Sequence, residues 1–110
     1  METSQDKFEN STDFTKAVFS AVKKIPLGKV TTYKLLAKAL GRPRAIRAVA
    51  SALKKNPDLI TTPCHRVIRS DGRTGGYCLG PKKKLWLLKN EGIKLTKDRV
   101  NCFEKFIYRF

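Results

Sequence analysis

Acidic residues are scarce in this sequence, and the scarcity is concentrated in one region. The chain has 110 residues, with 9 Asp and Glu against 24 Lys and Arg, which gives a formal net charge of +15. From Phe14 to Pro57 no acidic residue occurs. A folded segment that repels itself in this way usually has a polyanionic partner. We therefore expect nucleic acid as the partner, with a solvated basic face or an anionic membrane surface as the alternatives.

Long apolar stretches are also absent. No run of about 18 apolar residues exists, so no membrane-spanning helix is expected, and the polar N-terminus lacks the apolar core of a secretory signal. The sequence is 41% hydrophobic and 30% charged, a balance typical of one globular domain rather than a disordered chain. We expect a monomeric, cytoplasmic protein, associated with nucleoid or nuclear DNA and without membrane contact.

Cysteine and histidine are too few for a metal centre. The chain has three cysteines, Cys64, Cys78 and Cys102, and one histidine, His65. No C-x2-C pair occurs, so we expect no structural zinc and no other metal or cofactor. An odd number of cysteines without a secretory signal indicates reduced thiols rather than a disulfide framework.

Helical spacing of apolar residues dominates the first half of the chain. It predicts a helix from residue 14 to residue 25, with Thr12 or Asp13 as its N-cap. Two further helices, from about 32 to 40 and from 43 to about 55, follow with a tight turn between them, which is the layout of a helix-turn-helix. We therefore predict a mainly α fold, a winged-helix-like helix-turn-helix domain with a small β-ribbon.

Local signals bound the second and third helices. Thr31 or Thr32 is expected to cap the second helix and Gly41 to end it. Pro43 is expected at the first position of the third helix. The predicted apolar stripe of the second helix is Leu35, Leu36, Ala39 and Leu40.

The third predicted helix has two different faces. Its core side carries Ile46, Val49, Ala50 and Leu53. Its other side carries Arg44, Ala45, Arg47, Ala48, Ser51, Ala52 and Lys55. Small side chains let a helix backbone approach another surface closely, and arginines favour an anionic one. This face is therefore either a nucleic-acid interface or the wet side of an ordinary alanine-rich helix.

Beyond residue 56 the sequence predicts a ribbon, one more helix and a tail. Residues 67–68 are expected to pair with residues 76–77 across a turn at 70–72, which would form the β-ribbon. The last helix is expected over residues 82–90, with Gly92 as its terminator. Its inward side chains are predicted to be Leu85, Trp86 and Leu88.

These patterns divide the chain into three parts. Residues 1–13 are a polar N-terminal arm. Residues 14–93 form the main domain, and residues 94–110 form a tail whose aromatic residues indicate a short helix that folds back.

One cysteine is a candidate nucleophile. Cys64 stands between Pro63 and His65. A cysteine reacts as the thiolate and needs a nearby base, which His65 could provide through a bridging water. A histidine base works better when a carboxylate orients it, and Glu91 is the acid near the end of the last predicted helix. The alternative is a buried cysteine and a structural histidine without chemical roles.

Short motifs in a fixed order carry a resemblance to a known family. They are Ile25–Tyr33 (IPLGKVTTY), Arg47–Val49 (RAV), Asn56–Pro57 (NP), Pro63–Val67 (PCHRV), Gly75–Tyr77 (GGY) and Leu87–Gly92 (LLKNEG). Each motif alone is modest, but the ordered set is specific. From about residue 14 to residue 93 the chain resembles the DNA-binding, catalytic domain of O6-alkylguanine-DNA alkyltransferases, also called methylated-DNA–protein-cysteine methyltransferases.

The resemblance implies roles for four residues in alkyl transfer. Cys64 would attack the alkyl carbon on O6 of a damaged guanine and keep it as a thioether, so each molecule would act once. His65, oriented by Glu91, would take the thiol proton through a water. Tyr33 would donate to guanine N3 and neutralise the departing base, where the barrier should fall most.

The resemblance also implies a partner, double-stranded DNA that contains O6-alkylguanine. The damaged base would be rotated out of the duplex, Arg47 would enter the vacated stack, and the third helix would lie in the minor groove. The residues implied in DNA binding are Arg44, Ala45, Arg47, Ala48, Ser51 and Thr32. The residues implied at the base pocket are Val67, Tyr77, Cys78 and Leu79, with Asn56 as the hinge between the third helix and the active-site loop.

Two other interpretations involve different chemistry. A chain of about this length resembles the alkyltransferase-like proteins, which bind alkylated DNA without transfer and usually have tryptophan at the position of Cys64. A redox-sensing DNA-binding protein that joins Cys64 to Cys78 is the third interpretation. Transfer to Cys64, binding without transfer, and a reversible disulfide distinguish the three.

Overall fold

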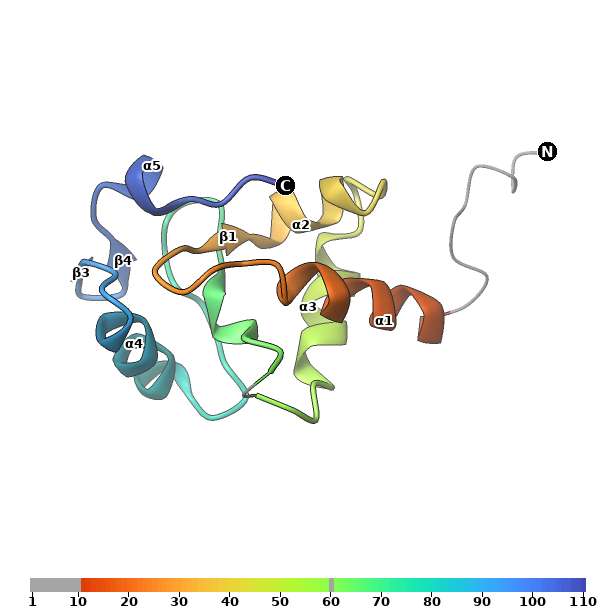
Figure 1. Ribbon diagram of the computed structural model, residues 1–110, viewed down its shortest axis with the longest axis horizontal. Coiled ribbons are helices and arrows are strands. Elements are labelled where there is room, and N and C mark those ends of the chain that lie inside the picture. Colours follow the sequence, from red (N-terminus) through yellow and green to blue (C-terminus); the bar gives the residue numbers. More distant parts are fainter. Residues whose placement is uncertain (1–10, 60) are drawn as a thin grey trace.

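The described residues, 11–59 and 61–110, form five α-helices, a 3₁₀ helix and four short strands (Figure 1). In chain order these are α1 (Ser11–Val22), β1 (Thr31–Thr32), α2 (Tyr33–Ala39), α3 (Ile46–Lys54), the 3₁₀ helix η2 (Cys64–Arg66), β2 (Val67–Ile68), α4 (Pro81–Asn90), β3 (Leu95–Thr96), β4 (Arg99–Val100) and α5 (Phe103–Phe106). The computed structural model thus confirms the mainly α fold class. Within these ranges no helix has the length and apolar character needed to cross a bilayer.

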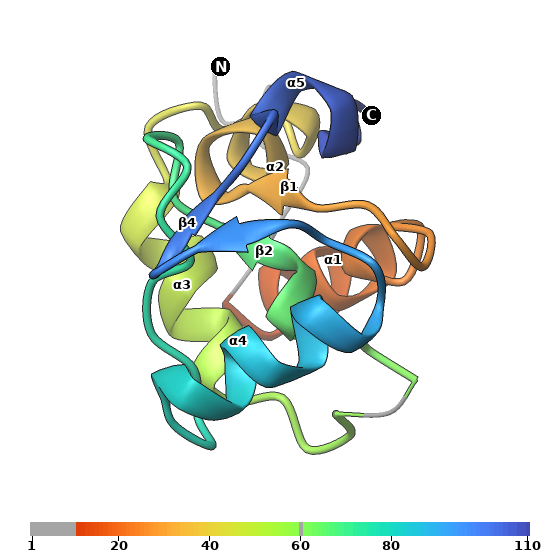
Figure 2. The same cartoon turned by 90° about the vertical axis from the view of Figure 1, so that its left-hand side faces the viewer.

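The helix-turn-helix formed by α2 and α3 packs against α1. Helix α3 contacts both α1 and α2, and the three helices lie together in both views (Figures 1 and 2). Their shared core includes the buried side chains of Phe14, Val18, Val22, Leu36, Ala37, Val49 and Leu53. Removal of this apolar surface from water is the main stabilising contribution to this half of the fold.

Helix α2 begins and ends as its sequence predicts. Thr32 is the N-cap, and its hydroxyl accepts a hydrogen bond of 3.0 Å from the backbone N–H of Leu35. At the other end Gly41 has φ of +79°, and the N–H of Arg42 bonds the carbonyl of Ala37 at 3.0 Å. This left-handed turn satisfies the last carbonyls of the helix and stops it.

Two predicted helix starts are wrong. Helix α1 begins at Ser11, so Thr12 and Asp13 lie inside it rather than at its cap, and it ends at Val22 rather than at residue 25. Helix α3 begins at Ile46, and Pro43 lies in the preceding turn, which closes through a 2.9 Å bond from the N–H of Ala45 to the carbonyl of Arg42. A proline fits a turn as well as a first helical position, so the local signal could not decide.

The buried faces of α2 and α3 are rotated from their predicted positions. On α2, Ala37 is buried and Ala39 is exposed. On α3, Ala52 is buried with Val49 and Leu53 rather than lying on the small basic face, whereas Ile46 is 39% exposed. Alanines on a short helix carry little periodic signal, so tertiary packing decides which of them is covered.

The predicted β-ribbon is wrong in its pairing. Strand β2 pairs in parallel with β1, with Thr31 opposite Val67 and Thr32 opposite Ile68, and not with residues 76–77. The four paired residues are buried, which is typical of parallel strands in the interior. The antiparallel ribbon of the fold lies instead in the tail, where β3 pairs with β4.

Helix α4 follows its predicted bounds but not its predicted orientation. Leu88 is buried, as expected, but Trp86 is 57% exposed and Leu85 is half-buried. Lys84, which precedes Leu88 by one helical turn, is only 1% exposed. Gly92, with φ of +89°, ends the helix as predicted, and the N–H of Ile93 bonds the carbonyl of Leu88 at 3.1 Å.

The tail packs on the body of the domain. The N–H of Val30 bonds the carbonyl of Phe106 at 2.9 Å, and the N–H of Tyr108 bonds the carbonyl of Val30 at 2.6 Å. A second core contains Val30, Ile68, Leu88, Ile93, Val100 and Phe106. The short helix expected in the tail is α5. The division at residue 93 stays a prediction, and most of the N-terminal arm lies outside the described residues.

We expect Thr32→Ala to lower the free energy of unfolding by about 1 kcal/mol, because α2 loses its N-cap hydrogen bond. Thermal or urea unfolding followed by circular dichroism measures the change. Thr96→Ala is the control, since Thr96 is exposed on β3. Equal stability of the two variants would contradict the capping role.

Candidate active site

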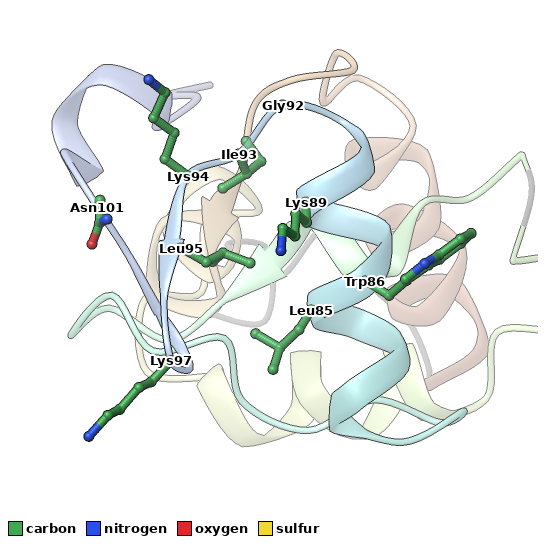
Figure 3. A pocket seen from close by; sticks show the side chains of 9 residues that line it. All are labelled: Leu85, Trp86, Lys89, Gly92, Ile93, Lys94, Leu95, Lys97 and Asn101. Carbon is green, nitrogen blue, oxygen red and sulfur yellow. The ribbon is translucent and has the colours of Figure 1, made fainter.

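Cys64 opens onto a cavity of about 670 Å³ between the helix-turn-helix and the loop that precedes α4. The lining residues are Tyr33, Ala50, Leu53, Lys54, Cys64, Arg69, Gly75, Gly76, Tyr77 and Cys78. Tyr33, Cys64, Tyr77 and Cys78 were expected in one site, and all four line this cavity. Another cavity of about 700 Å³ lies between α4 and β3 and contains none of them (Figure 3).

The Cys64 thiol is buried and protonated at rest. Cys64 begins η2 and is 6% exposed. Burial raises the pKa of the Cys64 thiol, although a hydrogen bond from Asn56 and the charge of Lys84 act to lower it. A thiol with a raised pKa is a poor nucleophile at neutral pH, so reaction requires a base that removes its proton.

Asn56 connects the end of α3 to the Cys64 segment, as its expected hinge position requires. Its side-chain N–H donates to the carbonyl of Thr62 at 2.9 Å, and its side-chain oxygen accepts from the N–H of Asp58 at 3.0 Å. The N–H of Cys64 in turn bonds the carbonyl of Thr62 at 2.8 Å. One buried amide therefore fixes the loop from which the thiol projects.

His65 and Glu91 meet as their sequence context predicts. His65 Nε2 lies 2.7 Å from Glu91 Oε2, and His65 is 5% exposed. Burial lowers the pKa of His65 and outweighs the raising effects of Glu91. The imidazole is therefore neutral at pH 7, with its proton on Nε2, where the carboxylate accepts it. Nδ1 is buried and has no hydrogen-bond partner among the described residues, which leaves its lone pair available.

Arg66 is a member of this site that was not predicted from the sequence. Its Nε and Nη2 atoms donate to the two oxygens of Glu91 at 2.9 and 3.0 Å, and Nη1 donates to the carbonyl of Ile25 at 2.9 Å. Burial acts to raise the pKa of Glu91, but the hydrogen bonds and charges of Arg66 and His65 outweigh it and the pKa is lowered. The carboxylate stays ionised. A planar guanidinium is suited to this two-point grip, and Arg66 follows His65 directly in the PCHRV motif.

Lys84 is the second residue of the site that was not predicted from the sequence, and its ammonium group lies next to Tyr33. Its Nζ donates to the carbonyls of Val67 and Gly76 at 2.7 and 3.1 Å and lies 3.4 Å from the Tyr33 hydroxyl. Burial lowers the pKa of Lys84 to about 8, with the neighbouring Cys64 acting in the opposite direction. Burial, and secondarily Cys64, raises the pKa of Tyr33. A run of three lysines indicates a solvated face. Lys84, however, precedes the buried Leu88 by four residues, about one helical turn, and this spacing could have identified Lys84 as an inward-facing residue.

The remaining predicted pocket residues lie at different depths. The Tyr77 ring meets the His65 ring edge-on, with centroids 6.3 Å apart, and burial raises the pKa of Tyr77 to about 12. Val67 is fully buried and, contrary to expectation, does not line the cavity, and its carbonyl accepts a hydrogen bond from Lys84. Cys78 lines the cavity and is exposed. Leu79 is 57% exposed and does not line the cavity, contrary to expectation.

The predicted DNA-binding residues gather around α3 but are not equally accessible. Arg44, Arg47, Ala48 and Ser51 are exposed. Ala45 is half-buried at the start of α3 and packs against the core, and Thr32 is 3% exposed because its hydroxyl caps α2. The exposed part of the face therefore extends from the turn along α3, whose Ala50 and Lys54 reach the cavity edge.

Chemically, the cavity brings together a nucleophile, Cys64, and a hydroxyl that can stabilise an anion, Tyr33, while the base His65 follows Cys64 in the chain and does not line the cavity. Within residues 11–59 and 61–110 no three His, Cys, Asp or Glu side chains are grouped to hold a metal ion. The three cysteines are free thiols. The arrangement fits group transfer to sulfur, with proton removal on one side of the cavity and proton donation on the other.

A family profile and a curated relative match most of this chain. The family profile described as "6-O-methylguanine DNA methyltransferase, DNA binding domain" matches residues 13–93. A methylated-DNA–protein-cysteine methyltransferase of Methanosarcina barkeri is 51% identical over 80 residues, which cover 73% of this chain and 51% of that protein. The chain therefore spans about half the length of this curated relative.

Two solved structures share the fold. S. pombe Atl1, crystallised with damaged DNA containing O6-carboxymethylguanine, superimposes with a TM-score of 0.78 at 28% identity over 90% of this chain and 97% of that one. Mycobacterium tuberculosis OGT, in complex with DNA, superimposes with a TM-score of 0.71 at 41% identity over 73% of this chain and 49% of that one. This chain therefore belongs to the 6-O-methylguanine DNA methyltransferase family, which it matches through that family's DNA-binding domain.

Proposed function

We propose that this protein repairs alkylated DNA by moving the alkyl group from O6 of guanine to its own Cys64. The observation that carries the proposal is the buried Cys64 thiol at a cavity, followed in the chain by a neutral His65 whose Nε2 contacts Glu91 and whose Nδ1 has no hydrogen-bond partner among the described residues. In the reaction the bond between O6 and the alkyl carbon breaks, and a bond between that carbon and sulfur forms. The guanine leaves with the electron pair of the broken bond.

Proton removal is the first requirement of this mechanism. The Cys64 proton passes to Nδ1 of His65 through a bridging water, and the product is a thiolate beside an imidazolium. Glu91 stabilises the imidazolium through the 2.7 Å contact at Nε2, and Arg66 keeps that carboxylate ionised and oriented. Because His65 is neutral at rest, it is able to accept the proton at pH 7.

Stabilisation of the leaving guanine is the second requirement. Tyr33 lines the same cavity and gives its hydroxyl proton to the purine as negative charge develops there. Lys84, 3.4 Å from that hydroxyl, stabilises the resulting phenolate and can replace its proton. The two cations near the reacting atoms therefore have different roles, since Arg66 orients the base and Lys84 supports the acid.

The target base has to reach the cavity from a duplex. A base inside the stack is inaccessible, so the nucleotide rotates out at a cost of roughly a few kcal/mol. Arg44 in the turn and the small exposed residues of α3 supply the surface for the minor groove, and Arg47 of α3 fills the vacated space. With such a substrate the protein would work in the DNA-containing compartment of the cell.

A second candidate function is recognition of alkylated guanine without transfer. It is favoured by the extent of the similarity to S. pombe Atl1, which covers 90% of this chain. The free thiol of Cys64 in the cavity favours transfer. A thioether does not hydrolyse, so transfer leaves a permanent mark on the protein that binding alone does not.

Incubation with duplex DNA containing O6-methylguanine is expected to add one methyl group to Cys64. Intact-mass and peptide mass spectrometry measure the adduct, and Cys64→Ser is expected to bind DNA without acquiring it. Cys102→Ser, which changes an exposed thiol, is the control and should be methylated like the wild type. DNA binding without an adduct on the wild type would support the recognition function, and loss of two hydrogens reversed by a thiol reductant would support the Cys64–Cys78 disulfide.

Arg47→Ala is expected to slow transfer from duplex DNA more than transfer from the free base O6-methylguanine. The free base does not have to be extruded, so only the duplex reaction loses the contribution of a side chain that occupies the vacated stack. Single-turnover rates for both substrates give the comparison. Lys24→Ala, on a basic residue outside the helix-turn-helix, serves as the control. Equal losses for duplex and free base would contradict the role of Arg47.

Glu91→Gln is expected to slow transfer by about a hundredfold, at the lower end of what general-base catalysis contributes, because His65 loses the carboxylate that holds its Nε2 proton and stabilises the imidazolium. Glu104→Gln, at an exposed acid in the tail, is the control.

The pH dependence of the wild-type rate tests the protonation state of the base. Because the pKa of His65 is lowered, the base stays neutral, so the rate should stay constant from about pH 8 to about pH 6.5 and fall only at lower pH. A wild-type rate that rises steadily with pH through this range would show direct ionisation of the thiol instead.

A further inference from the structure

The β3–β4 hairpin lies beyond residue 93, where the family match ends, yet it contacts the loop that builds the cavity. Leu95 pairs with Val100 and Thr96 with Arg99, around a turn at Lys97 and Asp98. The hairpin is anchored on its inner side, since Val100 is buried in the second core. Figure 3 shows Leu95 directed toward α4, while Lys94 and Lys97 point away.

The outer edge of the hairpin is bonded to residues 71–74. The N–H of Thr74 donates to the carbonyl of Asp98 at 2.8 Å, and the N–H of Val100 donates to the carbonyl of Gly72 at 2.9 Å. Arg99 adds a side-chain bond, from Nη1 to the carbonyl of Asp71, at 2.9 Å. Arg73 and Arg99 form an antiparallel bridge. Thr74 is 2% exposed, so the attachment is protected from water at this residue, whereas the Arg99 bond is exposed.

The two glycines that follow Thr74 form one wall of the cavity with their backbone. Gly75 and Gly76 line it together with Cys64 and Tyr33. A side chain at Gly75 would come within 3.3 Å of Arg69 and 3.9 Å of the Tyr33 hydroxyl, so the wall passes close to the group that meets the departing base. The far side of the wall is held at Gly76, whose carbonyl accepts from Lys84 at 3.1 Å.

We propose that the β3–β4 hairpin is a positioning element of the alkyl-transfer cavity, and that it sets the space available to the alkyl group. By holding residues 71–74 it fixes where the glycine wall stands relative to Cys64. Arg99 is the positioning residue whose side chain reaches the loop. This inference rests on the proposed function, because it concerns which O6 substituents that reaction accepts.

A loosened attachment has two expected effects. The wall moves more freely, so methyl transfer slows because the small group is no longer confined against the sulfur. Larger groups are penalised less, because the wall can retreat from them. Discrimination between O6-methylguanine and O6-benzylguanine therefore reports on the hairpin, whereas the rate for one substrate alone does not.

The test compares Arg99→Ala with Arg109→Ala. Both remove one exposed arginine from the tail and the same charge, but Arg109 pairs with Glu104 and does not contact the loop. Free bases are the substrates, so lost attraction to DNA phosphates does not enter. Arg99→Ala is expected to raise the benzyl-to-methyl rate ratio about threefold, a change typical of losing one exposed hydrogen bond. Arg99→Lys keeps a cationic donor and is expected to restore most of the ratio.

Amide hydrogen exchange gives a second measurement that does not depend on transfer. The amides of Thr74 and Val100 should exchange faster in Arg99→Ala than in the wild type or in Arg109→Ala. If the two alanine variants share one rate ratio and one exchange pattern, the proposal is overturned. If the wild type forms no adduct on Cys64, the proposed function fails, and the exchange data alone then support or overturn the attachment. Deletion of the hairpin is avoided, because Val100 belongs to the core.

Discussion

The contact between a neutral imidazole and a partly buried carboxylate is the interaction on which the candidate site depends. Arg66 and Glu91 carry opposite charges, and with a neutral His65 the group has no net charge at rest. Transfer of the Cys64 proton to His65 then creates a thiolate and an imidazolium together, so the protein interior gains no net charge. A buried site tolerates this change far better than it would tolerate an isolated thiolate. The raised pKa of the thiol is therefore compatible with reactivity and limits unwanted reactions at rest.

Helix α4 brings two of the charges that the site needs. Lys84 in α4 and Glu91, the residue that caps its C-terminus, are seven positions apart, about two helical turns, so both lie on the same side of the helix axis. Lys84 reaches Tyr33 and the carbonyls of Val67 and Gly76, while Glu91 reaches His65 and Arg66. The left-handed Gly92 ends the helix directly after Glu91 and fixes the position of that carboxylate. One rigid element thus connects the acid and base sides of the proposed reaction.

Sequence patterns predicted the parts of the fold that local chemistry determines. The cap at Thr32 and the glycine stops at Gly41 and Gly92 follow from local backbone requirements and are present. The pairing of β2 with β1 could not be predicted, because strands of two residues carry no register signal and the partner lies 36 positions away, at Thr31 opposite Val67. The hairpin of the tail was missed for the same reason.

The site was predictable where residue chemistry is distinctive and not where burial decides the role. The pairing of His65 with Glu91 was expected from the need of a histidine base for a carboxylate, and the two side chains do meet. The burial of Lys84 was not expected, since a lysine normally remains in water and only the carbonyls around it make burial possible. Trp86, on the same helix, was expected to face inward and is exposed instead, because α4 is oriented so that Lys84 faces the interior.

The measurement that tests the central claim most directly is the protonation state of His65 by nuclear magnetic resonance. The chain contains one histidine, so long-range nitrogen–proton correlations report on this ring without ambiguity. The account predicts a neutral ring at pH 7 with the proton on Nε2 and a bare Nδ1, and titration only at a pH below the usual range of histidine. A ring that is charged at pH 7, or one that carries its single proton on Nδ1, would contradict the account, because neither form can accept the proton of Cys64 at Nδ1.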